Sequence, residues 1–291
     1  MNTISAAKNI SPENIAFNDP DYPIYVRRDL LSTYPHYAAP SHWHDEVEFI
    51  TVFSGKMDYN INGEVYSLKE GEGIFVNSRQ MHFGFSQQTE CDFVCVILHP
   101  MLLCSSAVMN KGYISPLIEN QALPCLKFSR KESWHLQVIE QLKYIYQIKD
   151  TPAAPLKIQA AFGFVWALLF EHMPASYRPK RNSDENLSIV KKMVYFIQLN
   201  YMEKISLGDI ARAGTVGESK CCRLFRDYLG QTPNAYLTAY RLNKSRESLG
   251  STDMSIAEIA VEVGFCGASY YAETFRKFYG ESPSEYRRKG R

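Results

Sequence analysis

The stretch SIAEIAVEVGFCGASYYAETFRKFYGESPSEY, residues 255–286, is the second copy of a pattern that first occurs as SLGDIARAGTVGESKCCRLFRDYLGQTPNAY at residues 206–236. Positions near the start of the copies recur 49 residues apart, and positions near the end recur 50 residues apart. The matched pairs are Ser206/Ser255, Ile210/Ile259, Ala211/Ala260, Phe225/Phe275, Gly230/Gly280, Pro233/Pro283 and Tyr236/Tyr286. The difference of one residue falls in a predicted turn, so both copies are expected to share one local fold.

Each copy has the signals of a helix-turn-helix. The serine that begins each copy is a suitable cap for a short helix, because its hydroxyl accepts a hydrogen bond from the backbone N–H groups at a helix start. A turn and a second helix follow, in which Cys221 with Phe225, and Tyr271 with Phe275, form a buried i, i+4 stripe. The glycine of each copy can end that helix in the left-handed conformation, and the proline is a good first residue for the next one.

The opposite face of each second helix is polar. Such a helix fits the major groove of DNA, where an arginine can bridge the two acceptors of guanine. The solvated side of an ordinary helix pair would explain one such face, but it explains two copies joined by a helix at 234–250 less well. The predicted DNA-binding residues are Ser219, Lys220, Cys222, Arg223, Arg226, Ser269, Tyr270, Glu273 and Arg276.

With this paired arrangement, and with GFCGASYYAETFRKFYGESPSEYR at 264–287, the segment 186–288 resembles the C-terminal DNA-binding domain of AraC/XylS-type transcriptional regulators. The resemblance implies that the two recognition helices enter adjacent major-groove segments on one face of the duplex. The sequence departs from the family at Gly217, where a capping serine is common, and at Cys222, where a longer polar side chain often lies. The base readers implied by the resemblance are Ser219, Cys222, Arg223, Ser269, Tyr270 and Glu273.

Charge is distributed unevenly along the 291 residues. Residues 1–175 contain 13 Lys/Arg and 18 Asp/Glu, a net charge of −5, whereas residues 176–291 contain 19 and 13, a net charge of +6. A basic C-terminal part indicates a polyanionic partner for that part alone.

The sequence predicts a cytoplasmic protein that does not insert into membranes. Residues 1–20, MNTISAAKNISPENIAFNDP, lack the basic and apolar segments of a secretory signal. The longest apolar run, AAFGFVWALLF at 160–170, is about half of the ~20 residues that span a bilayer, which favours a buried helix. Seven cysteines, an odd number, indicate reduced thiols.

Residues 22–98 are typical of short strands broken by Gly and Asn turns, including VEFITVFSG at 47–55 and KMDYNING at 56–63. Many short strands in succession indicate an antiparallel barrel or sandwich. After about residue 130 the apolar period changes from two to about 3.6. It predicts one helix that starts after Ser129 and a second at 155–173 that is apolar nearly all round, so that it can also contact a dimer partner.

A pattern typical of metal binding occurs in SHWHDEVEFITVFSG at 41–55, where His42, His44, Glu48 and Gly55 match the first motif of the cupins. This segment resembles a cupin. In cupin enzymes a second motif brings a further histidine, and three imidazoles and a carboxylate then hold a divalent metal, a set suited to Fe, Mn, Ni or Zn. Here the candidate is His82, although its motif is two residues shorter than that of the enzymes and lacks the usual Pro and Gly.

Three interpretations of this region stay open. The pocket binds a small effector and requires no cofactor, or it holds a divalent metal, or the histidines end a strand while Glu48 satisfies a buried donor. The predicted effector-binding residues are His42, His44, Glu48, Tyr59, Asn77 and His82. The predicted metal ligands are His42, His44, Glu48 and His82.

The sequence therefore predicts an α+β multidomain fold, with an N-terminal antiparallel, cupin- or jelly-roll-like β-barrel and a C-terminal all-α domain with two helix-turn-helix motifs. The predicted function is that of a transcriptional regulator, not an enzyme, which forms a homodimer, binds double-stranded promoter DNA and senses a small molecule such as a sugar. The alternative is a metal-dependent cupin enzyme or metal sensor fused to a DNA-binding domain. The predicted segments are an N-terminal arm at 1–20, the effector-binding barrel at 21–125, a helical dimerisation segment at 126–175, a linker at 176–185 and the DNA-binding domain at 186–291, with helix-turn-helix motifs at about 206–229 and 255–279.

Overall fold

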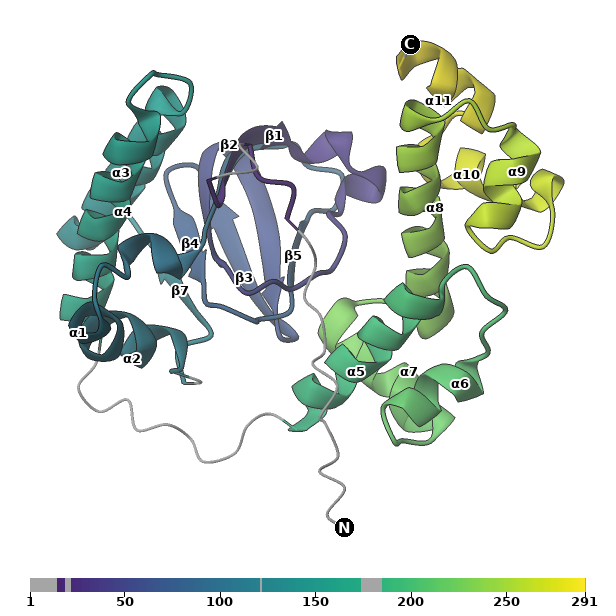
Figure 1. Ribbon diagram of the computed structural model, residues 1–291, viewed down its shortest axis with the longest axis horizontal. Coiled ribbons are helices and arrows are strands. Elements are labelled where there is room, and N and C mark those ends of the chain that lie inside the picture. The colour runs from purple at the N-terminus through teal and green to yellow at the C-terminus, as the bar shows by residue number, and fades with distance from the viewer. Residues whose placement is uncertain (1–14, 19–21, 121, 174–184, 291) are drawn as a thin grey trace. The chain divides into compact units, whose positions relative to one another are not determined.

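The computed structural model describes residues 15–18, 22–120, 122–173 and 185–290, which form two compact units that divide near residue 184. Figure 1 shows that the first unit combines a β-sheet with helices and that the second is all-helical. The predicted fold class is thereby confirmed. Most of the predicted arm at 1–20 and almost all of the predicted linker at 176–185 lie outside the described residues.

One long strand, β2, organises the antiparallel sheet of the first unit. Its first half pairs with β6 and β4, and its second half pairs with β3 and β5. The main strand order is β1-β6-β2-β4-β7. The strands are β1 (Ile24–Leu30), β2 (Val47–Ile61), β3 (Glu64–Lys69), β4 (Gly73–Val76), β5 (His82–Phe85), β6 (Cys91–Leu98) and β7 (Cys125–Phe128).

The sequence pattern predicts two strands where the structure has β2 alone. The strand stays continuous because a bulge between Val52 and Ser54 bends it. Gly55 follows at a φ of +79°, and a Cβ there would lie 2.1 Å from the carbonyl oxygen of Glu90. The bend folds the second half of β2 back over the inner face of the first, so Glu48 and Tyr59 approach each other.

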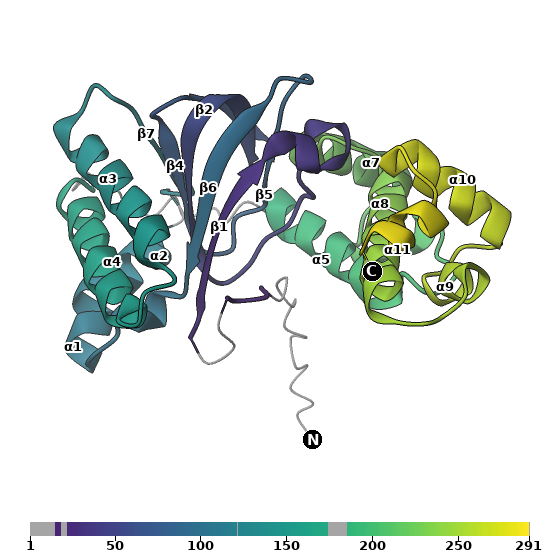
Figure 2. The same ribbon diagram turned by 90° about the horizontal axis from the view of Figure 1, so that it is seen from above.

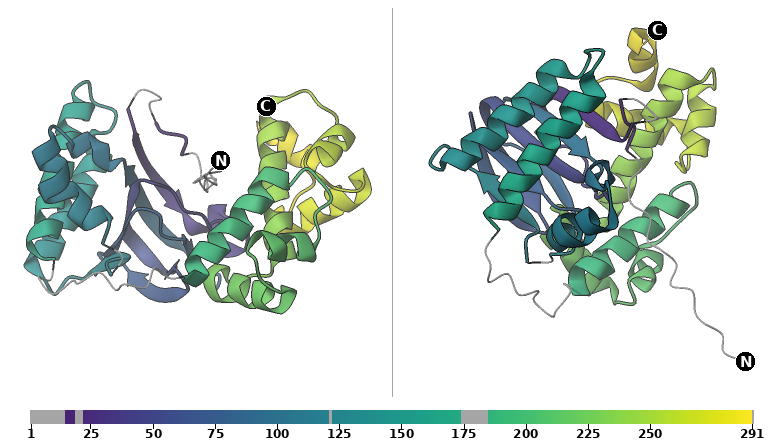
Figure 3. Two further views of the ribbon diagram at one scale, coloured as in Figure 1. Left: turned by 60° about the horizontal axis from the view of Figure 1, so that its bottom comes forward. Right: turned by 60° about the vertical axis from the view of Figure 1, so that its left-hand side comes forward.

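The two faces of the sheet have different neighbours. Phe49 and Phe75 point to the outer face and belong to one apolar core with Phe162 and Trp166 of helix α4. Helices α3 (Ser133–Ile148) and α4 (Ala154–Glu171) pair with each other and cover this face, as Figures 2 and 3 show. Ile50 and its neighbours on alternate positions belong to a second core on the inner face. The first part of β2, from Val47 to Val52, is therefore buried on both of its faces.

Helix α3 begins later than its sequence indicates. It starts at Ser133 with Glu132 as the N-cap, and no side chain caps it. Ser129 is instead the residue after β7, and its backbone N–H donates to Nδ1 of His135 at 3.2 Å. Strand β7, which is not predicted from the sequence, therefore ends directly before Ser129, the predicted cap.

Helix α4 is long and apolar enough to cross a membrane by length and composition alone. It is a core helix of the first unit, because Ile158, Phe162, Val165 and Leu169 are buried against α3 and the sheet. This agrees with the buried helix that the apolar run predicts.

A short helical segment between β6 and β7 was also not predicted. It consists of α1 (Ala107–Met109), one π-helical turn (Asn110–Ile114) and α2 (Ser115–Ile118). Ile114 and Leu117 are its buried residues, and both pack into the core beneath α4. The indole N–H of Trp166 donates to the carbonyl of Tyr113 at 3.0 Å.

The second unit is built around helix α8, with one helix-turn-helix group at each end of it (Figure 1). The first group contains α5, α6 and α7, and the second contains α9, α10 and α11. Phe225 is buried in the first group and Phe275 in the second, as the repeat predicts. The bounds are α5 (Glu185–Asn200), α6 (Leu207–Ala213), α7 (Glu218–Leu229), α8 (Pro233–Ser251), α9 (Ile256–Glu262), α10 (Ala268–Tyr279) and α11 (Pro283–Gly290).

Candidate DNA-binding face and His–Glu cluster

The first helices of the two helix-turn-helix groups begin as the sequence indicates. Ser206 and Ser255 each form a capping box, in which the serine hydroxyl accepts from the N3 backbone and the N3 carboxylate accepts from the serine backbone. Gly230 and Gly280 end α7 and α10 in the left-handed conformation, at φ values of 66° and 82°. These local signals fix the length and direction of α7 and α10.

The polar face of α7 is exposed or partly exposed at each of its predicted DNA-binding residues. Ser219, Arg223 and Arg226 are exposed, whereas Lys220 and Cys222 are partly buried. The nearby Arg212 of α6 pairs with Asp209, but neither Arg223 nor Arg226 forms an ion pair with any described residue. Their charge is therefore available to an external anion.

The polar face of α10 carries less charge. Ser269, Tyr270, Glu273 and Arg276 are all exposed, and the Tyr270 side chain packs its ring near Phe265 at 5.9 Å between centroids. At the matched positions, α10 therefore has Tyr270, Glu273 and Arg276 where α7 has Lys220, Arg223 and Arg226. Neither α7 nor α10 has a side chain that caps its first turn, in keeping with Gly217 and Gly267 at those positions.

In the first unit, backbone pairing assembles a cluster of three histidines and one glutamate. His42 and His82 form an isolated antiparallel bridge, with both N–H groups donating to the partner carbonyl at 3.1 and 2.9 Å. His44 lies two residues further on the same side, and Glu48 is on the first half of β2. One donor atom from each of these four residues lies within 4.8 Å of the others.

The histidine rings of the cluster share one hydrogen-bonding pattern. The Nδ1 atoms of His42, His44 and His82 lie 2.9, 3.1 and 2.8 Å from the backbone carbonyls of residues 40, 46 and 80. A carbonyl oxygen only accepts, so each Nδ1 must carry the proton of that hydrogen bond. In the neutral form of each ring, Nε2 then has a lone pair.

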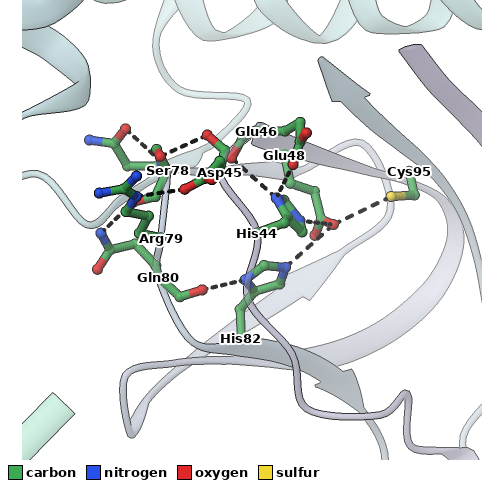
Figure 4. A network of polar contacts seen from close by, with 10 residues as sticks. His44, Asp45, Glu46, Glu48, Ser78, Arg79, Gln80, His82 and Cys95 are labelled. Carbon is green, nitrogen blue, oxygen red and sulfur yellow. Dashed lines mark hydrogen bonds and ion pairs between the residues drawn. The ribbon is translucent and has the colours of Figure 1, made fainter. Parts of the chain in front are cut away.

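The lone pairs of two of these rings point to one carboxylate oxygen. Oε2 of Glu48 lies 3.4 Å from Nε2 of His82 and 3.6 Å from Nε2 of His44 (Figure 4). His44, Glu48 and His82 are buried, and Nε2 of His44 has no hydrogen-bond partner among the described residues. Burial acts to raise the pKa of Glu48, but His82 and His44 hold it well below the usual value. The arrangement therefore favours a positive charge between the rings and the carboxylate.

Two further side chains, Tyr59 and Cys95, contact the Glu48 carboxylate. The Tyr59 hydroxyl donates to Oε1, and the Cys95 thiol lies 3.6 Å from Oε2, on the side away from the histidines (Figure 4). Burial, and then the charge of Glu48, raises the pKa of both Tyr59 and Cys95 well above the usual values. Both therefore stay protonated and act as donors. The lack of a side chain at Gly84 lets the Tyr59 ring lie close to β5, since a Cβ there would be 3.0 Å from the ring.

One predicted residue is not brought to the cluster. The Asn77 amide donates to the carbonyls of Leu117 and Leu123 at 2.9 and 3.0 Å, and its Oδ1 accepts from the backbone of Ser78 at 2.8 Å. Asn77 thus ties the loop before β5 to α2 and to the segment that follows it. The structure brings His42, His44, Glu48, Tyr59 and His82 together, and it adds Cys95, which the sequence analysis did not single out as a site residue.

Comparison with known proteins agrees with both halves of this description. Residues 31–97 match a cupin domain model, and residues 210–289 match a helix-turn-helix domain model. The regulator YdeC of Bacillus subtilis is 29% identical over 254 residues, which cover 86% of each chain. The melibiose operon regulatory protein of Escherichia coli is 26% identical over 273 residues, which cover 92% of this chain and 89% of that protein. The chain belongs to the AraC family of transcriptional regulators.

This AraC-family protein is thus a DNA-binding transcriptional regulator with a cupin-like domain. Its relatives are named as regulators of transcription, which implies a role other than catalysis. Among solved structures, apo ToxT from Vibrio cholerae covers 91% of this chain and 97% of its own, at 15% identity and a TM-score of 0.49.

Cys222 offers a test of the DNA-binding face of this AraC-family regulator. At pH 8, N-ethylmaleimide is expected to label the exposed Cys266 and the partly exposed Cys222 and Cys104. Cys91 stays unlabelled, because burial raises the pKa of its thiol to about 12. Bound DNA should slow the labelling of Cys222 by about tenfold or more, since a covered thiol does not react, and leave Cys104 unchanged. Peptide mass spectrometry measures both rates, and equal rates at Cys222 with and without DNA would argue against α7 as a reading helix.

Proposed function

We propose that this AraC-family regulator binds promoter DNA through α7 and α10 and that a ligand in the His–Glu cluster of its cupin-like unit controls this binding. The observation that carries the proposal is that one ligand atom from each of three imidazoles and the Glu48 carboxylate lies within 4.8 Å of the others, each imidazole being held by a backbone carbonyl through Nδ1. A ring that donates through one nitrogen and presents the other is the usual form of a metal-ligating histidine.

The donor set of the cluster fits a divalent cation. Three imidazole nitrogens and one carboxylate suit Zn, Fe or Ni better than the hard cations Mg and Ca. The hydrogen bond from Tyr59 gives Glu48 a structural role as well, but it uses Oε1 only and does not account for the histidines around Oε2. We therefore assign His42, His44, Glu48 and His82 as the residues that would hold a cation.

A bound cation would act as a Lewis acid for oxygen atoms of a small metabolite. Access to it would be past His42, which is partly exposed, because the other three side chains are buried. A small effector with hydroxyl, carbonyl or carboxylate oxygens, such as a sugar or a related metabolite, fits this description. Its effect on DNA binding requires only that it binds one state of the protein more tightly than the other.

Elemental analysis and calorimetry test the cation. We expect about one equivalent of a transition metal in gently purified protein, and Ni²⁺ binding that weakens as the pH falls, because protons compete for the imidazole nitrogens. A cation at 100 times its dissociation constant should also stabilise the fold by ~2.7 kcal/mol, which raises the melting temperature. Ni²⁺ titrations that give the same affinity at pH 5.5 and pH 7.5 would contradict the assignment.

The same donor set would also serve a metal-dependent enzyme, which is the second candidate function. Recovery of the effector distinguishes the two. A metabolite that stabilises the protein is incubated with the metal-loaded protein and then analysed by mass spectrometry. A sensor returns it unchanged, whereas an enzyme converts it.

We also propose that the regulator is a homodimer that associates through the outer face of α4. Leu156 and Phe164 lie two turns apart on this face with exposed fractions of 73% and 45%, and the small side chains of Ala160 and Ala167 lie between and beyond them. Such a stripe is self-complementary across a two-fold axis, so a second copy of the chain covers it.

All seven cysteines are free thiols, which supports a location in the reducing cytoplasm.

Charged residues on this stripe should abolish the dimer. In a Leu156→Glu/Phe164→Glu variant, each lost side chain removes about 1.5–3 kcal/mol of burial, so we expect the dimer dissociation constant to rise at least about 100-fold. Sedimentation equilibrium measures it. The control is Gln137→Glu, which adds the same negative charge at an exposed position of the neighbouring helix α3. A double variant that remains dimeric would place the interface elsewhere.

A further inference from the structure

The middle of α8 contains an arginine that holds the end of another helix. Nε of Arg241 donates to the carbonyl of Tyr201 at 2.7 Å, and Nη2 donates to the carbonyl of Glu203 at 2.8 Å. These carbonyls belong to the turn after α5, which is part of the first helix-turn-helix group. A guanidinium is suited to two such bonds because its donors are fixed in a planar fork.

The second helix-turn-helix group reaches the same point through Gly264, in the turn between α9 and α10. A Cβ at Gly264 would lie 2.4 Å from the carbonyl oxygen of Tyr201, 2.8 Å from that of Met202 and 2.9 Å from Nη2 of Arg241. The first group, the connecting helix and the second group therefore meet within a few ångströms of one another. We call Arg241, Gly264 and the carbonyls of residues 201–203 the junction.

A glycine at position 264 could be required by the positive φ of the turn or by the close approach of another backbone, and the internal repeat distinguishes these two reasons. Thr215 occupies the equivalent turn of the first copy, since Ala211 and Ala260 are matched and the register is unbroken between them and this turn. Thr215 has a φ of 57° and Gly264 a φ of 85°, so a residue with a side chain is tolerated in this turn conformation. The glycine at 264 is needed because the backbone of the first group packs against it.

A series of aromatic contacts connects the junction to the hydrophobic cores of both helix-turn-helix groups. Phe225 of the first core contacts Tyr236, which stacks with Tyr240, and Tyr240 meets Tyr201 edge-to-face at 5.2 Å between centroids. Tyr201 in turn packs against the core of the second group, which includes Phe275. Closely packed rings are hardly compressible, so a shift of one core shifts the other with it.

We propose that the junction sets the position of α10 relative to α7 and thereby lets both helices read one duplex together, with Arg241 and Gly264 as positioning residues. The inference rests on α7 and α10 being the reading helices. Without the junction each helix-turn-helix keeps its own core and caps, and the second core still includes Leu242 and Leu249 of α8, but the first group loses its direct tie to the second. The two binding events are then linked less tightly, and the gain in affinity from their combination falls.

Footprinting on DNA tests the proposal with the full-length protein. A duplex is first selected from a random 30-base-pair pool with the wild-type chain, and hydroxyl-radical footprinting then maps the protected segments. We expect Gly264→Ala to protect the segment read by α7 but not the segment read by α10, and to bind at least about tenfold more weakly. Thr215→Ala is the matched control, because it places alanine in the same turn of the other copy, and it should keep both segments. If Gly264→Ala protects both segments with wild-type affinity, the proposal is wrong.

A second variant and a DNA-free measurement complete the test. Arg241→Lys keeps the charge and loses the fork, so it should show the same loss of the second segment even if Gly264→Ala does not fold. Hydrogen exchange is also compared between Arg241→Lys and the wild type without DNA. In the variant, exchange should be faster at the amides of Glu203 and Phe265, which are hydrogen-bonded in the two turns of the junction. At the capped start of α6 it should be unchanged. Unchanged exchange at both amides would overturn the junction, whereas failure of the wild type to select any DNA would count against α7 and α10 as reading helices and not against the junction.

Discussion

A Glu48→Gln variant is expected to bind Ni²⁺ more than about 100-fold more weakly than the wild-type protein. Glutamine has nearly the shape of glutamate and can still accept from Tyr59, but it lacks the negative charge that lies 3.4 to 3.6 Å from two histidine nitrogens. Loss of an outer partner of a metal ligand typically costs 10- to 100-fold in affinity, so loss of a charged ligand should cost more. Isothermal titration of chelator-treated protein measures the difference.

Tyr59→Phe is the matched control for this prediction. It removes the hydrogen bond to Oε1 of Glu48 and leaves all four donor residues in place. Its effect on Ni²⁺ affinity should therefore stay within the roughly 10- to 100-fold range of an outer partner. Equal affinities of Glu48→Gln and the wild type would show that the cluster has only a structural role.

An Arg223→Ala variant is expected to bind the selected duplex about 5- to 150-fold more weakly, and to lose its preference at one guanine. This range corresponds to the ~1–3 kcal/mol that a bidentate arginine contributes to discrimination. Arg223 is exposed on α7 and has no ion pair among the described residues, so the wild type does not have to break one to reach a base. Competition with duplexes that differ at single base pairs measures both the affinity and the preference.

Arg212→Ala serves as the control for Arg223→Ala. Arg212 is also an exposed arginine of the first helix-turn-helix, but it lies on α6 and pairs with Asp209. Its removal should leave the base preference unchanged. The logarithm of the wild-type association constant should also fall linearly with the logarithm of the salt concentration, because phosphate contacts release counterions. An Arg223→Ala variant with an unaltered base preference would remove Arg223 from the reading surface.

The helical unit was predictable from its sequence because its signals are local. The serine caps, the closing glycines and the buried stripe of Phe225 act within a few residues of their positions in the chain, and they recur in the second copy. The junction was not predictable in this way. Gly264 looks like an ordinary turn residue until the carbonyl of Tyr201, 63 residues earlier, is placed against it.

In the sheet unit the sequence identified the four cluster residues but not their arrangement. The hydrogen bond that each ring makes through Nδ1 depends on a backbone carbonyl, which residue identity does not reveal. Asn77 was predicted to bind the effector, but its amide instead donates to the carbonyls of Leu117 and Leu123, 40 and 46 residues away. Contacts at such sequence distances cannot be read from the residue itself. The continuity of β2 was missed for a similar reason, since the bulge between Val52 and Ser54 arises in the pairing of β2 with the distant strand β6.

The link between the His–Glu cluster and DNA is tested most directly by the dissociation constant of the selected duplex, measured for wild type and Glu48→Gln after chelator treatment and again after reloading with Ni²⁺. Coupling of ~1.4 kcal/mol gives a tenfold change, and we expect at least this change in the wild type and none in Glu48→Gln. A wild-type dissociation constant that is the same in both conditions would contradict control of DNA binding by the cluster.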